Sequence, residues 1–184
     1  YYKGYNFIIV RNYINYRNIL DEPTSYNNNI IQFVHLGNIT EVRGIKEIVE
    51  FAKVLNPHID FKINMIGPFY NNKIETDTHD IIQKLNIHNR FNFHGSINND
   101  KAIALLKNYD FGLCFLHPIE NNKNSVVTKF FEYMAKSLPI IATDIALWND
   151  FFKLNNCGIN IDIFNMESQV DKIKIFLNDE KKNN

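Results

Sequence analysis

The stretch IIQFVHLGNITEVRGIKEIVEFAKVL, residues 30–55, decides the fold. Its first part, residues 30–36, is a short and nearly all-apolar run, which is typical of a strand buried on both faces of a sheet. A glycine-containing loop follows. Ile45, Ile48, Val49 and Ala52 then recur at the i, i+3, i+4, i+7 spacing of an amphipathic helix. The stretch therefore predicts the first strand, loop and helix of a βαβ unit.

The same alternation of strand and helix continues toward the C-terminus. Five further strands are expected at residues 61–66, 91–94, 111–116, 140–143 and 158–161. Amphipathic helical stretches separate them, and parallel strands need such crossover connections. The sequence therefore predicts a doubly wound α/β domain, a Rossmann-like parallel sheet with helices on both faces. Ligands of such folds bind beyond the carboxyl ends of the strands, so the loops there should carry the function.

Composition excludes several classes of protein. The 184 residues contain 20 basic and 20 acidic side chains, and a nucleic-acid-binding face would need a basic excess. No apolar run reaches the roughly 18 residues of a membrane-spanning helix. Cys114 and Cys157 form no C-x-x-C pair, and the histidines have no H-x-x-x-H spacing. We therefore expect two reduced thiols, no metal site and a cytoplasmic protein, with peripheral contact with the inner membrane left open.

The first 29 residues differ from the rest. After a strand-like run at 7–10, some twenty polar residues rich in asparagine precede the regular pattern. We expect residues 1–29 to be the end of a preceding domain with a connecting segment, and residues 30–184 to form the Rossmann-like domain. The asparagine clusters at 71–72, 98–99 and 121–122 are expected to lie in loops and to have no chemical role.

The loop from Gly37 to Gly44 is the first candidate site. It contains Arg43, which the pattern places in the first turn of the following helix. A cation there opposes the helix dipole, whereas exposed backbone N–H groups favour an anion. Arg43 and these amides could share a phosphate. Alternatively, Arg43 could pair with Glu47 or Glu41, and the local pattern leaves both open.

The second candidate loop leads into the helical stretch that begins near residue 125. Ser125 is expected as the N-cap, so that the amides of residues 126–128 point at an anion. Glu132, one turn further, could accept two hydrogen bonds from a ribose diol. The alternative is a surface role, because Glu132 and Lys136 form a favourable i, i+4 pair and Lys129 lies three residues before Glu132.

Residues 124–144, NSVVTKFFEYMAKSLPIIATD, resemble the hallmark segment of family 4 glycosyltransferases. That segment has a glutamate, seven residues, a second glutamate, a short helix and then small-x-Pro-Val-Ile-Ala. Residues 37–44 are similar to the family's Gly-Arg-x-x-x-x-Lys-Gly segment. Residues 61–67 and 91–95 resemble two further landmarks. The four agree in order and spacing, and the resemblance covers about residues 30–178.

The resemblance implies two Rossmann-like domains, of which this one grips a nucleotide-sugar donor and the other holds the acceptor glycan. It also implies transfer with retention and without a catalytic metal or other cofactor. By position, Arg43 stabilises the leaving diphosphate and Glu132 binds the ribose. Other donor-binding positions carried over in the same way are Gly37, Asn38, Gly67, His94, Asn124, Ser125, Val126, Val127 and Lys129.

Two residues depart from the family. Asn38 stands where the first basic residue is usual, so one phosphate contact is lost or is supplied from elsewhere. Asn124 stands at the first glutamate, eight residues before Glu132, where the family contacts the transferred sugar. An asparagine there keeps hydrogen bonding but carries no charge. Glu120, in the same loop, is a weaker substitute.

The resemblance leaves the nucleotide base, the sugar and the acceptor open. A UDP-sugar or GDP-sugar donor is expected, and common use of such enzymes favours bacterial polysaccharide or envelope glycan assembly. The relatives usually continue into a helix that crosses back to the first domain, so we expect this chain to bind donor without efficient transfer. A sugar-nucleotide epimerase of the same plan and a non-catalytic nucleotide-binding module are the alternatives.

Overall fold

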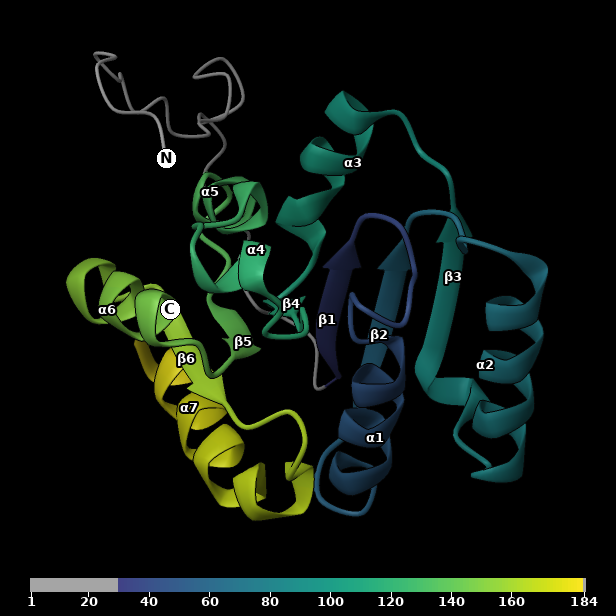
Figure 1. Cartoon of the computed structure of the whole chain (residues 1–184). Coiled ribbons are helices and arrows are strands. Elements are labelled where there is room, and N and C mark those ends of the chain that lie inside the picture. The colour runs from purple at the N-terminus through teal and green to yellow at the C-terminus, as the bar shows by residue number, and fades with distance from the viewer. Residues whose placement is uncertain (1–29, 184) are drawn as a thin grey trace, which may run out of the picture.

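A computed structural model describes residues 30–183, with side chains described up to residue 180. Its core is one six-stranded sheet in the order β3-β2-β1-β4-β5-β6, and every neighbouring pair is parallel (Figure 1). The strands are β1 (Ile31–Leu36), β2 (Phe61–Ile66), β3 (Phe91–Gly95), β4 (Phe111–Cys114), β5 (Ile140–Thr143) and β6 (Gly158–Ile161). The predicted fold class is confirmed. The predicted segment 1–29 lies outside the described residues.

The strand order reverses between β1 and β4. The chain adds β2 and then β3 on one side of β1, returns to its other side with β4, and continues outward through β5 and β6. The loops after β1 and β4 therefore run in opposite directions at the carboxyl edge of the sheet. A crevice opens between such loops, and ligands of doubly wound folds bind there.

The helices cover both faces of the sheet (Figure 1). Helices α1, α2 and α7 contribute to the core on one face, and α3, α5 and α6 to the core on the other. Their bounds are α1 (Ile45–Leu55), α2 (Asn72–Lys84), α3 (Asn99–Leu105), α4 (Glu120–Lys123), α5 (Thr128–Met134), α6 (Ala146–Asn155) and α7 (Val170–Asn183). Three short 3-10 turns accompany them, η2 (His88–Arg90), η3 (Leu106–Asn108) and η4 (Met166–Gln169).

Alternation along the strands divides the core in two. On β1, Phe33 faces α1, whereas Val34 and Leu36 face the helices on the other side of the sheet. Phe33 is fully buried and its ring meets Phe51 of α1 edge to face, 5.1 Å between centroids. A strand that is apolar at nearly every position is explained by this burial on both faces.

The structure corrects two expected boundaries. The strand expected at 111–116 ends at Cys114, because its ladder with β5 stops there. The chain then turns toward the first loop, where the His117 amide donates to the Val42 carbonyl at 2.9 Å. Helix α4, residues 120–123, forms in what was expected to be an irregular loop.

The asparagine clusters are more than loop filler, and that prediction was wrong. Asn71 caps α2, its side chain accepting from the Ile74 amide at 2.9 Å, and Asn98 caps α3 through the Asp100 amide. Asparagine is favoured at this position because its short side chain satisfies an otherwise free helix amide.

Cys114 and Cys157 are both free, as predicted, and burial raises the pKa of each thiol to about 11. Among the residues that the structure describes, no helix combines the length and the apolar character needed to cross a bilayer.

Candidate functional site

The loop between β1 and α1 is held tightly against the neighbouring strand. The Gly37 amide donates to the Ile66 carbonyl at 2.7 Å, and a side chain at Gly67 would lie 2.2 Å from the Gly37 carbonyl oxygen. Both glycines have positive φ, +117° and +145°. Only glycine allows this close approach of two loops, so both positions serve the backbone.

Arg43 precedes α1 instead of lying in its first turn, which corrects the prediction. Gly44, in the left-handed conformation, is the N-cap, and α1 begins at Ile45. The Arg43 amide donates to the backbone oxygen and the hydroxyl of Thr40, at 3.2 and 3.1 Å. The arginine is thus fixed by its backbone, and its side chain extends away from the helix.

The alternative that Arg43 serves as a surface ion pair is not realised. Glu41 pairs with Lys46 at 2.8 Å, and Glu47 lies 3.0 Å from the His117 imidazole. No carboxylate lies within 4 Å of the Arg43 guanidinium among the described residues. Both acidic candidates in the loop are engaged by other cations.

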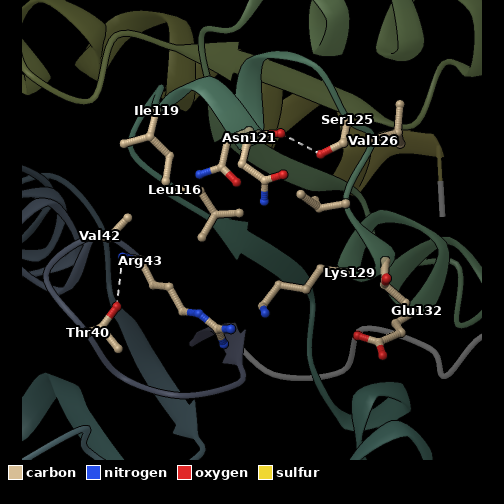
Figure 2. Close-up of a pocket in the computed structure, with 13 residues that line it drawn as sticks. Thr40, Val42, Arg43, Leu116, Ile119, Asn121, Ser125, Val126, Lys129 and Glu132 are labelled. Carbon is tan, nitrogen blue, oxygen red and sulfur yellow. Dashed lines mark hydrogen bonds between the residues drawn. The ribbon is translucent and has the colours of Figure 1, made fainter. Parts of the chain in front are cut away.

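Arg43 and Lys129 converge on Gly37. A methyl group at Gly37 would lie 2.7 Å from the Lys129 Nζ and 2.9 Å from an Arg43 guanidinium nitrogen. Figure 2 shows the two side chains extending toward each other from α5 and from the β1–α1 loop. Two cations brought this close, without a carboxylate between them, make a site that favours an anion.

Burial and charge both act on this pair. Burial lowers the pKa of the Lys129 ammonium, and the charge of Arg43 lowers it further. Burial raises the pKa of Glu132, whereas Lys129 opposes that shift. Glu132 forms no hydrogen bond or ion pair with another described residue, including Lys136. Its carboxylate is therefore available to a ligand.

Helix α5 starts later than predicted. Val127 is its N-cap, without a side-chain cap, and Ser125 instead donates its hydroxyl to the Asn121 carbonyl at 2.8 Å. The buried Trp148 ring nitrogen donates to the Ser125 carbonyl, also at 2.8 Å. The amides of Val126 and Val127 donate to no other described residue. The predicted cap was wrong, but free amides do lie beside Lys129.

These residues border a cavity of about 470 Å³ between the β1–α1 loop and the segment from β4 to α5 (Figure 2). It is lined by Thr40, Val42, Arg43, Leu116, Ile119, Asn121, Asn122, Ser125, Val126, Val127, Thr128, Lys129 and Glu132. We call it the first cavity.

A second cavity of about 290 Å³ adjoins it on the side of β2 and α3. It is lined by Leu36, Gly37, Asn38, Ile66, Gly67, Pro68, Ser96, Ile97, Asn99, Ala102, Lys129 and Glu132. Lys129 and Glu132 line both cavities, so they stand at the junction, with Gly37 beside them. One elongated ligand could occupy both halves.

Two predicted residues lie away from both cavities. His94 is exposed, and its ring hydrogen-bonds the Asn64 side chain at 3.1 Å. Asn124 donates its amide to the backbone and carboxylate oxygens of Glu120, at 2.9 and 2.7 Å. The other predicted residues, from Gly37 to Glu132, line one cavity or the other.

Sequence reasoning missed three polar residues at the site. Asn121 and Asn122 line the first cavity, because an unexpected helix raises them from the loop. His35 of β1 is buried, and neither ring nitrogen has a hydrogen-bond partner among the described residues. Burial, followed by the charge of Lys129, lowers its pKa to about 3, so the ring is neutral at pH 7. Its position in an apolar run gave no signal.

No cluster of three or more potential metal ligands occurs in the described part of the chain. The expectation that the protein needs no metal stays a prediction.

Solved structures place the fold. The chain superimposes on a Rickettsia africae glycosyltransferase with a TM-score of 0.68 and 21% identity, over 84% of this chain and 40% of that one. For S. aureus TarM, solved with UDP, the values are 0.71, 17%, 97% and 34%. For the C-terminal domain of a group 1 glycosyl transferase from Francisella tularensis they are 0.64, 17%, 83% and 79%. The chain thus spans less than half of the first two proteins.

None of the curated sequences compared with the chain matches it. The family model of the glycosyl transferases group 1, in contrast, matches residues 17–184. A match over this much of the chain agrees with the sheet order and with the crevice at its switch point. The chain therefore belongs to the glycosyl transferases group 1 family.

Proposed function

We propose that this chain is the donor-binding domain of a retaining, metal-independent glycosyltransferase of family 4 that uses a UDP-sugar or GDP-sugar. The acceptor glycan would be held largely by residues outside this chain. The observation that carries the proposal is the meeting of Arg43 and Lys129 at Gly37, with no carboxylate to neutralise them.

A diphosphate would relieve the electrostatic cost of this arrangement. Two like charges in a partly buried site repel each other, and burial already disfavours the charged form of Lys129. Phosphate oxygens would pair with both cations and with the free amides of Val126 and Val127. The positive charge that a divalent metal would otherwise supply would then come from Arg43 and Lys129.

The two cavities suit the two ends of a sugar nucleotide. With the diphosphate at the junction, the nucleoside would lie in the second cavity and the transferred sugar in the first. Glu132, which lines both, would accept hydrogen bonds from the ribose hydroxyls. Its neighbour Lys129 would hold the adjacent phosphate, so one turn of α5 would read the ribose and the charge together.

The same groups would assist bond breaking. As the glycosidic bond breaks, negative charge grows on the departing diphosphate, and fixed cations and amides stabilise it without having to reorganise. Because Arg43 is held by its backbone at Thr40, its guanidinium would be positioned before the donor arrives.

The ribose role of Glu132 predicts discrimination against deoxynucleotides. The protein should bind UDP or GDP about tenfold to a hundredfold more tightly than the corresponding 2′-deoxynucleotide, because a hydrogen bond to a charged acceptor is lost. In Glu132→Gln this ratio should fall toward one. Isothermal titration of both nucleotides into both proteins measures it.

Glu75→Gln is the matched control, since Glu75 is a carboxylate of the first turn of α2, away from both cavities. It should keep the wild-type ratio. If Glu132→Gln kept the ratio as well, the ribose would have to be held elsewhere, and the assignment of the second cavity would be wrong.

A further inference from the structure

Asn122 is the most enclosed polar side chain of the first cavity. It belongs to α4, lines the cavity together with Arg43 and Lys129, and is only 8% exposed. The family's sugar-contacting position would be Asn124, two residues further, but that side chain is bound to Glu120 and lines neither cavity. Asn122 therefore occupies a place that the motif spacing does not indicate.

The orientation of the Asn122 amide is fixed by the protein. Its Nδ2 donates to the His117 carbonyl oxygen at 2.8 Å. An amide oxygen at that position would face another acceptor, so the nitrogen must point toward His117 and the oxygen away from it. The Oδ1 atom forms no hydrogen bond with any other described residue.

The His117 carbonyl is itself held in place. It also accepts from the Ile119 amide at 2.8 Å, and the His117 amide donates to Val42 of the phosphate-side loop at 2.9 Å. The His117 ring lies 3.0 Å from Glu47 of α1. The acceptor oxygen of Asn122 is thus anchored, through one residue, to the loop that carries Arg43.

A fixed acceptor selects among the parts of a donor. Phosphate oxygens accept hydrogen bonds and cannot pair with an amide oxygen, whereas a sugar hydroxyl or an N-acetyl N–H can donate to it. A nearly buried acceptor that stays unpaired is also costly, so a ligand that supplies the donor gains the difference.

We infer that Asn122 is the residue that reads the transferred sugar, accepting a hydrogen bond from one of its hydroxyl or amide groups. The inference rests on the proposed function and adds a specificity-determining residue to it. Asn122 then separates nucleotide sugars from free nucleotides, while Arg43 and Glu132 bind both alike.

The test compares the affinity of the protein for a free nucleoside diphosphate with its affinity for sugar nucleotides of the same base. The probes are UDP, UDP-glucose, UDP-galactose and UDP-N-acetylglucosamine, with GDP and GDP-mannose as the second series. Asn122→Ala should weaken the preferred sugar nucleotide about threefold to tenfold and change the affinity for the free diphosphate less than twofold. The unchanged diphosphate affinity also shows that the variant is folded.

Two comparisons make the result specific. Asn155→Ala removes an amide that likewise donates to a backbone carbonyl, at Phe151, and should change neither affinity. Asn124→Ala tests the position that the family spacing indicates. A loss of sugar affinity in Asn124→Ala alone, or an equal loss of both affinities in Asn122→Ala, would overturn the inference. Failure of the wild-type protein to bind any of these nucleotides would instead refute the proposed function, and this inference with it.

Discussion

Replacing Arg43 with alanine should slow sugar transfer by the full-length protein roughly a hundredfold to a thousandfold, the usual effect of removing one preorganised charge from an active site. Binding of the nucleoside diphosphate to the chain should weaken about tenfold to a hundredfold, because charge-assisted hydrogen bonds are lost. Single-turnover kinetics and isothermal titration measure the two effects.

The same substitution should leave stability unchanged or slightly improved. Arg43 has no acidic partner within 4 Å among the described residues, and it lies next to Lys129. Its removal relieves repulsion and exposes little apolar surface. Loss of function without loss of stability is the signature of a residue placed for a ligand.

Lys46→Ala is the matched control, since Lys46 is an exposed cation three residues further that pairs with Glu41 at 2.8 Å. Surface pairs of this kind contribute little, so both transfer and binding should stay near wild type. If Lys46→Ala impaired transfer as much as Arg43→Ala, a general loss of positive charge would explain the effect. The specific role of Arg43 would then be refuted.

Gly44→Ala should produce the largest loss of stability. Gly44 caps α1 with φ +81°, and a methyl group there would lie 2.1 Å from the Phe115 carbonyl oxygen. The left-handed conformation costs alanine about 1–2 kcal/mol, and overpacking against backbone typically adds about 1–3 kcal/mol. We expect the free energy of unfolding to fall by about 3 kcal/mol, measured by urea denaturation.

Gly95→Ala separates the two costs. Gly95 also has positive φ, +66°, but nothing lies within 4 Å of the position its methyl group would take. Only the conformational cost remains, so this variant should lose about 1–2 kcal/mol. Equal losses in the two variants would show that the contact with Phe115 does not hold the Arg43 loop in place.

The fold followed from the sequence because its signals are local and repeated. The apolar runs of β1 and β2 and the periodic face of α1 each predict one element, and the alternation of strands and helices predicts a parallel sheet. Boundaries were less certain where a partner decides them. The strand at 111–116 ends at Cys114 because its neighbour β5 ends, which no local pattern reveals.

The site was predictable where a motif fixes the backbone. Arg43, Lys129 and Glu132 come together as the family spacing implied. The errors lie in the loop after β4, where Ser125 was expected to cap a helix. Helix α4 forms just before it, and Ser125 bonds back to Asn121. A four-residue helix has too little periodicity to be recognised, so the position of Asn122 could not be predicted.

Thermal denaturation of this chain with UDP, GDP, ADP and CMP, in EDTA and in magnesium, tests the central claim most directly. Inorganic pyrophosphate is included as an anion without a nucleoside. At about 100 times its Kd, a ligand adds about 2.7 kcal/mol, which should raise Tm by roughly 5–10 °C for a domain of this size. We predict such a rise for UDP or GDP, of equal size with and without magnesium, and absent in Arg43→Ala. No rise with any nucleotide, or an equal rise with pyrophosphate alone, would contradict the claim that the chain binds a nucleotide-sugar donor.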